Sequence, residues 1–153
     1  APGRSMSDYE LILNNTQIPV IFDNTYNLIQ LSEAAIVTSG TATLETALLG
    51  TPQIVCYKSS YLSFLIAKFI VKLNYISLVN IIMKKDVIDE LIQSNCNSKN
   101  ICFSLEKILN KSCAKKIKFN YQKLFEVLDC GGASKITSSL ILKRIKKKKL
   151  LTL

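Results

Sequence analysis

The residues best suited to chemistry lie close together, between Ser39 and Glu45. Gly40 lets the backbone bend and approach a ligand closely, and the hydroxyls of Ser39, Thr41 and Thr43 are suited to cap a helix that begins there. The free N–H groups of a first helical turn, with the positive end of the helix dipole, bind anions such as a diphosphate. Glu45 lies about one helical turn beyond Thr41, so its carboxylate could accept hydrogen bonds from ribose hydroxyls.

Two interpretations of this segment remain open. It predicts a site for a nucleotide diphosphate, but a Ser-Gly-Thr turn between a strand and a helix is also common in α/β proteins, where Glu45 would be an ordinary solvated residue. The chain contains neither Gly-x-x-x-x-Gly-Lys-Ser/Thr nor Gly-x-Gly-x-x-Gly, the more specific phosphate-binding patterns.

Two strands and a helix must position this turn. Residues 34–37 are apolar without polar alternation, which is typical of a parallel strand covered on both faces. The helix after Gly40 should end at Gly50, and residues 53–57 should form the next strand. Beyond them the pattern predicts several helices: 61–73, 86–93, 98–110 with Ser98 as its N-cap, 114–129 stopped by two glycines, and 134–146.

The composition excludes several classes of site. The chain has no His and its five cysteines form no Cys-x-x-Cys pair, so we expect no metal site and no Ser or Cys hydrolase triad. The odd, scattered cysteines argue against a disulfide framework and for a reducing cytoplasm, with Cys56 as a small core residue.

The net charge of +9 suits an anionic partner. Six Lys and Arg residues within 143–149 precede an apolar end at 150–153, a pattern that could rest on anionic lipid headgroups or could be a solvated tail. No aromatic residues are interleaved with these charges, so we expect a membrane surface rather than a nucleic acid. The apolar segment 61–73 is interrupted by Lys68 and Lys72 and is shorter than the roughly 20 residues that span a bilayer, so core packing is favoured there over membrane docking.

Four blocks in order, residues 39–52, 55–58, 75–82 and 90–93, resemble the C-terminal half of the lipid-A-disaccharide synthase family, and weaker similarity extends over residues 1–142. This family consists of glycosyltransferases of the two-domain GT-B type. The resemblance implies an α/β fold: the Rossmann-like C-terminal domain, with a parallel sheet flanked by helices and a helical C-terminal segment.

The resemblance also assigns site residues. It implies that the UDP part of a sugar donor is bound by seven residues: Ser39, Gly40, Thr41, Ala42, Glu45, Lys58 and Asn80. Lys58 would face phosphate or be a solvated loop residue, and Asn80 would contact the donor or bond to a turn of its own backbone. Val79 stands where the family usually has Pro, so this loop loses a fixed φ.

The implied reaction transfers 2,3-diacylglucosamine from UDP to 2,3-diacylglucosamine 1-phosphate, forming lipid A disaccharide 1-phosphate without a metal or cofactor. We expect residues 1–130 to be the donor-binding domain and 131–153 a C-terminal helix with a basic tail. The N-terminal acceptor domain, with the catalytic base, would be absent from this chain, which would then be inactive alone. A cytoplasmic protein, peripheral at the inner membrane, is implied, and a homodimer is left open.

Two other functions remain as alternatives. One is a different lipid glycosyltransferase that uses UDP-N-acetylglucosamine, of the peptidoglycan type, because such enzymes share a glycine turn followed by a ribose-binding Glu. The other is a non-catalytic basic binding module, which rests on the net charge alone.

Overall fold

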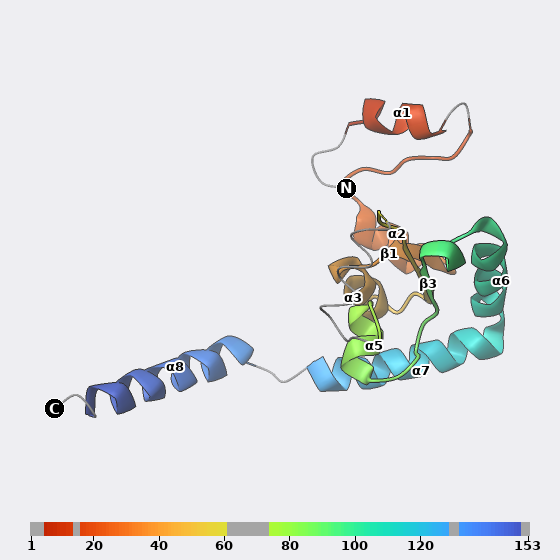
Figure 1. Cartoon of the computed structure of the whole chain (residues 1–153). Helices are drawn as coiled ribbons and strands as arrows, with labels where there is room; N and C mark the ends of the chain where they lie inside the picture. Colours follow the sequence, from red (N-terminus) through yellow and green to blue (C-terminus); the bar gives the residue numbers. More distant parts are fainter. Residues whose placement is uncertain (1–4, 14–15, 61–73, 129–131, 151–153) are drawn as a thin grey trace.

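A computed structural model of the chain describes residues 5–13, 16–60, 74–128 and 132–150 (Figure 1). The predicted helix over residues 61–73 lies outside these ranges, as do the predicted domain boundary at 130 and residues 151–153. The N-terminal elements are the helices α1 (Ser7–Leu13) and α2 (Thr25–Leu31).

The centre of the fold is a three-stranded parallel sheet in the order β1-β2-β3, made of Ala35–Thr38, Gln53–Tyr57 and Glu90–Ile92. Ile36 pairs with Ile54, and Cys56 pairs with both Thr38 and Leu91. The central strand β2 supplies Ile54 and Val55, which are fully buried. The predicted α/β fold with a parallel sheet is therefore confirmed, and the bounds of β2 agree with the prediction.

Helices pack around this sheet (Figure 1). The helix α3 (Thr41–Leu48) joins β1 to β2 and contacts both strands, while α6 (Ser98–Leu109) packs on β2. The long helix α7 (Lys111–Leu128) contacts α3, α6 and the short helix α5 (Leu78–Met83). Core residues on these helices include Ala47, Val79, Ile108 and Leu124.

Gly50 ends α3 as predicted, by a Schellman motif. Its φ is +83°, its N–H donates to the carbonyl of Ala47, and the N–H of Thr51 donates to the carbonyl of Thr46. This stop places Pro52 directly before β2, so the turn, the helix and the next strand follow one another within 20 residues.

Three predictions about local structure are wrong. Residues 86–93 are not a helix, because β3 pairs with β2 there and buries Leu91, and a 3-10 helix, η1 (Gln93–Asn95), follows. The strand at 34–37 is not covered on both faces: in the sheet of the described residues β1 lies at the edge, and Ile36 is 54% exposed.

The third concerns the N-terminus of α6, whose cap is Asn97 rather than Ser98. Asn97 has an extended backbone and its side chain accepts from the N–H of Asn100. The following helix, α7, begins at Lys111, three residues before the predicted start, and the last helix, α8, runs over Ala133–Leu150. In Figure 1 α8 extends away from the sheet, and residues 134–145 are all exposed.

Candidate functional site

The predicted anion site is the turn between β1 and α3. Gly40 is the N-cap of α3, with φ +149° and ψ −162°, a conformation that side-chain-bearing residues rarely adopt. No side chain of residues 5–13, 16–60, 74–128 or 132–150 accepts a hydrogen bond from the first turn of this helix. Among the described residues, the N–H groups of Thr41 and Ala42 have no acceptor, so they can bind an anion.

The hydroxyls near this turn do not act as the expected caps. Thr43 Oγ1 donates to the carbonyl of Gly40 at 2.8 Å, and Ser39 Oγ donates to the carbonyl of Ile76 at 3.0 Å. Both hydroxyls therefore bind carbonyls, whereas a cap would accept from an amide. This arrangement favours anion binding, because no described side chain competes for the amides of Thr41 and Ala42.

Glu45 lies one turn into α3, half-buried, and its carboxylate has no hydrogen-bond partner within the described residues. Side chains on a helix lean toward its N-terminus, so this carboxylate extends over the turn that carries Thr41 and Ala42. A charged acceptor without a partner beside an exposed helix start is suited to bind hydroxyl groups of a ligand held there.

Lys58 is exposed and directly follows β2. The pairing of Thr38 with Cys56 places the ends of β1 and β2 at the same edge of the sheet, so Lys58 and the Gly40 turn share that edge. Ligands of open parallel sheets bind at this carboxyl-end edge. The structure thus brings Lys58 to the same side as Ser39, Gly40, Thr41, Ala42 and Glu45.

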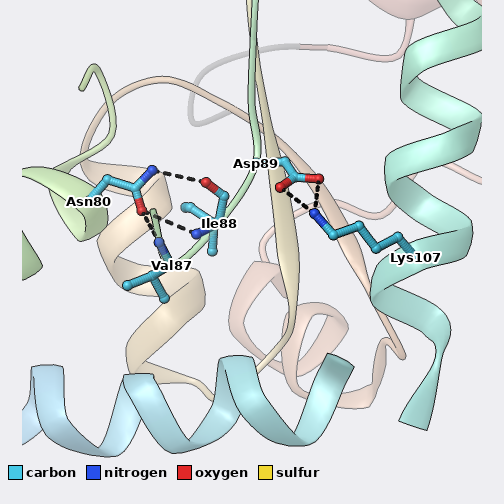
Figure 2. Close-up of polar contacts among 5 residues, drawn as sticks. All are labelled: Asn80, Val87, Ile88, Asp89 and Lys107. Atoms are coloured by element: carbon cyan, nitrogen blue, oxygen red, sulfur yellow. Dashed lines mark hydrogen bonds and ion pairs between the residues drawn. The ribbon is translucent and has the colours of Figure 1, made fainter. Parts of the chain in front are cut away.

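Asn80 is different, because its side chain is fully buried and every hydrogen-bonding position of its amide is used. Figure 2 shows the three hydrogen bonds to Val87 and Ile88. Oδ1 accepts from the N–H groups of Val87 at 2.9 Å and Ile88 at 3.1 Å. Nδ2 donates to the carbonyl of Ile88 and to Glu90 Oε1, both at 2.9 Å. No group remains for a donor substrate, so the structure favours the alternative in which Asn80 fixes a turn of the backbone.

Two residues that sequence reasoning missed hold the loops beside this edge. Glu90 accepts from the N–H groups of Ile76 and Ser77, and Gln93 is bonded to the backbone of Ser59 through both its carbonyl oxygen and its amide. Both residues lie in the block 90–93 of the family resemblance, which was interpreted as a helix. The sequence does contain a signal for a strand here. Glu90 and Gln93 flank the apolar pair Leu91 and Ile92, and this pattern also suits a short buried strand.

Two described residues, Cys56 and Tyr121, have shifted pKa values. Burial raises the pKa of the Cys56 thiol to about 11, with the neighbouring Cys96 as a second cause. Burial also raises the pKa of Tyr121, whose hydroxyl accepts from Gln53 Nε2 at 3.3 Å. In the part of the chain that the structure describes, no three His, Cys, Asp or Glu side chains gather where they could hold a metal ion.

Comparison with known proteins gives consistent matches. A family model described as lipid-A-disaccharide synthetase matches residues 7–143. Proteins named lipid-A-disaccharide synthase match from Syntrophus aciditrophicus (43% identity over 80% of this chain and 32% of that protein), Sulfurihydrogenibium (36% over 84% and 34%) and Geobacter sulfurreducens (30% over 90% and 36%). The chain thus spans about a third of the length of these curated relatives.

Proposed function

The chain belongs to the lipid-A-disaccharide synthase family, and on this premise we propose that it holds the UDP part of the sugar donor in such a glycosyltransferase. The observation that carries the proposal is the start of α3: within the described residues, the amides of Thr41 and Ala42 have no acceptor and the carboxylate of Glu45, one turn deeper, has no partner. The spacing matches a diphosphate followed by a ribose, because one helical turn of about 5.4 Å separates the two groups.

Each predicted residue then has a role. The amides of Thr41 and Ala42 bind diphosphate oxygens, Gly40 provides the backbone geometry, and Ala42 leaves room for the ligand because its side chain is small. Glu45 accepts from the ribose hydroxyls and Lys58 adds a positive charge near the phosphates. Ser39 and Asn80 hold backbone around the site, since their side chains are already bonded to protein groups.

The proposed reaction is the transfer of 2,3-diacylglucosamine from UDP to 2,3-diacylglucosamine 1-phosphate. An acceptor hydroxyl forms the new bond to the anomeric carbon, its proton passes to a base, and the bond to the β-phosphate breaks so that UDP leaves. The amides and dipole at the start of α3 stabilise the negative charge that develops on UDP. The relatives are about three times as long as the matched part, and we place the acceptor site and the base in their additional length.

We also propose that the protein works at the cytoplasmic surface of the inner membrane. Among the helices in the described ranges, none has the length and apolar character needed to cross a bilayer. The helix α8 carries exposed apolar side chains, among them Ile136, Leu140 and Ile145, next to the basic residues of 143–149. Such a combination suits a surface with anionic lipid headgroups.

A UDP titration tests the donor site, with Glu45→Gln as the variant and Glu106→Gln, an exposed residue of α6, as the matched control. Hydrogen bonds to a charged group contribute about 1.5–3 kcal/mol, so we expect roughly 10-fold to 150-fold weaker binding for Glu45→Gln and no change for the control. The wild type should also bind 2′,3′-dideoxy-UDP weakly, and Glu45→Gln should bind both ligands alike. Equal UDP affinity of the wild type and Glu45→Gln would contradict the ribose assignment.

A further inference from the structure

The carboxylate of Glu90 receives four hydrogen bonds from one short stretch of chain. Oε2 accepts from the N–H of Ile76 at 2.9 Å. Oε1 accepts from the N–H of Ser77 at 3.0 Å, from Ser77 Oγ at 2.6 Å and from Asn80 Nδ2 at 2.9 Å. Ser77 is the N-cap of α5, so Glu90 fixes the loop that leads into this helix and the start of the helix itself.

The same loop is bonded to the Gly40 turn. Ile76 uses its N–H to bind Glu90 and its carbonyl to accept from Ser39 Oγ at 3.0 Å. The path from Glu90 to the start of α3 therefore contains one residue, Ile76, and one hydroxyl, that of Ser39. The helices α3 and α5 also pack against each other, which keeps the two segments together.

The strand that carries Glu90 also holds the second loop at this edge of the sheet. Gln93 Oε1 accepts from the N–H of Ser59 at 2.9 Å and its Nε2 donates to the carbonyl of Ser59 at 3.2 Å. Ser59 follows Lys58 directly. The short strand β3 and the residue after it thus fix the backbone of two loops, one bonded to the Gly40 turn and one directly after Lys58.

We propose that Glu90 is a positioning residue for the nucleotide site, acting on the Gly40 turn through Ile76 and Ser39. This inference rests on the proposed function. A carboxylate is required because all four partners donate to it, and an amide would place an NH₂ group against one set of these donors. Positioning and simple charge repulsion have opposite effects on the affinity for UDP. A negative charge near a diphosphate weakens binding, whereas a group that positions the site strengthens it.

The test is the dissociation constant for UDP of the full chain, with Glu90→Gln as the variant and Asp89→Asn as the control. Asp89 is the adjacent residue and its removal changes the net charge by the same amount, but its carboxylate binds Lys107 instead (Figure 2). Measured at a temperature where thermal melts show each protein folded, Glu90→Gln should bind UDP about 5-fold to 20-fold more weakly, and Asp89→Asn within about twofold of the wild type.

Two readouts separate positioning from general loss of stability. Amide hydrogen exchange at Ile76 and Ser77 should be faster in Glu90→Gln and unchanged in Asp89→Asn. In a double-mutant cycle, Glu90→Gln should weaken UDP binding much less when Ser39→Ala is already present, because the hydrogen bond from Ser39 Oγ to the carbonyl of Ile76 is then missing. Additive effects of the two substitutions would overturn the path through Ile76.

If Glu90→Gln does not fold, Ser77→Ala removes the 2.6 Å hydrogen bond to Glu90, together with the cap on the N–H of Asn80, and keeps the carboxylate; it should weaken UDP binding about 2-fold to 5-fold. A wild type that binds UDP, together with variants that bind it equally well or more tightly, overturns this inference alone. A wild type that does not bind UDP overturns the proposed donor site and this inference with it.

Discussion

Replacing Asn80 with Ala tests whether this side chain is a structural element of the fold. The substitution removes four hydrogen bonds at once and leaves the buried backbone N–H groups of Val87 and Ile88, and the carbonyl of Ile88, without their partner. Val87 and Ile88 are both buried, so water does not readily replace the lost amide.

The expected cost follows from these contacts. A hydrogen bond within a protein contributes about 1 kcal/mol net, and four of them suggest a loss near 4 kcal/mol in the free energy of unfolding. That is a large part of the roughly 5–15 kcal/mol that stabilises a typical domain. At about 2–4 °C per kcal/mol for a protein of this size, the melting temperature should fall by about 8–16 °C.

The assay is urea unfolding followed by circular dichroism at a helix band, because the chain contains no Trp for a fluorescence signal. Asn97→Ala is the matched control, since Asn97 is exposed and its side chain makes two hydrogen bonds: Oδ1 caps α6 by accepting from the N–H of Asn100, and Nδ2 donates to the carbonyl of Ser94. Loss of such a cap costs about 1 kcal/mol. A cost for Asn80→Ala no larger than that of Asn97→Ala would refute the reasoning.

Three further predictions concern single residues. Gly40→Ala should lower stability by about 1–3 kcal/mol in the same unfolding assay, because φ is +149° there although an added Cβ would contact nothing within 4 Å. In iodoacetamide labelling read by mass spectrometry, Cys56 should react more slowly than the exposed Cys102. The pKa of Cys56 rises from 9.0 to about 11 on folding, so the free energy of unfolding should fall between pH 9 and 11, where the unfolded state releases this proton first. The variant Cys56→Ala should show a smaller fall over the same pH range. Asp89→Asn should cost at most about 1 kcal/mol, and less in high salt, because its 2.8 Å pair with Lys107 is partly exposed.

The elements near the candidate site were predictable because their signals are local. The Gly40 turn, the stop at Gly50 and the strand β2 each depend on residues within a few positions of one another. The same holds for the position of Glu45 one turn into α3. The segment 86–93 was predicted wrongly because its state depends on pairing with β2, more than 30 residues earlier in the chain.

The sequence by itself determined the chemistry of the turn: a glycine where the backbone bends, a helix start, and an acid one turn later. Only the tertiary structure decided which polar groups remain available for a ligand. The Asn80 amide uses all its hydrogen-bonding positions on Val87, Ile88 and Glu90, whereas the amides of Thr41 and Ala42 find no acceptor in the part of the chain that the structure describes. Burial and hydrogen bonding between segments far apart in the chain set that difference, and no local pattern encodes it.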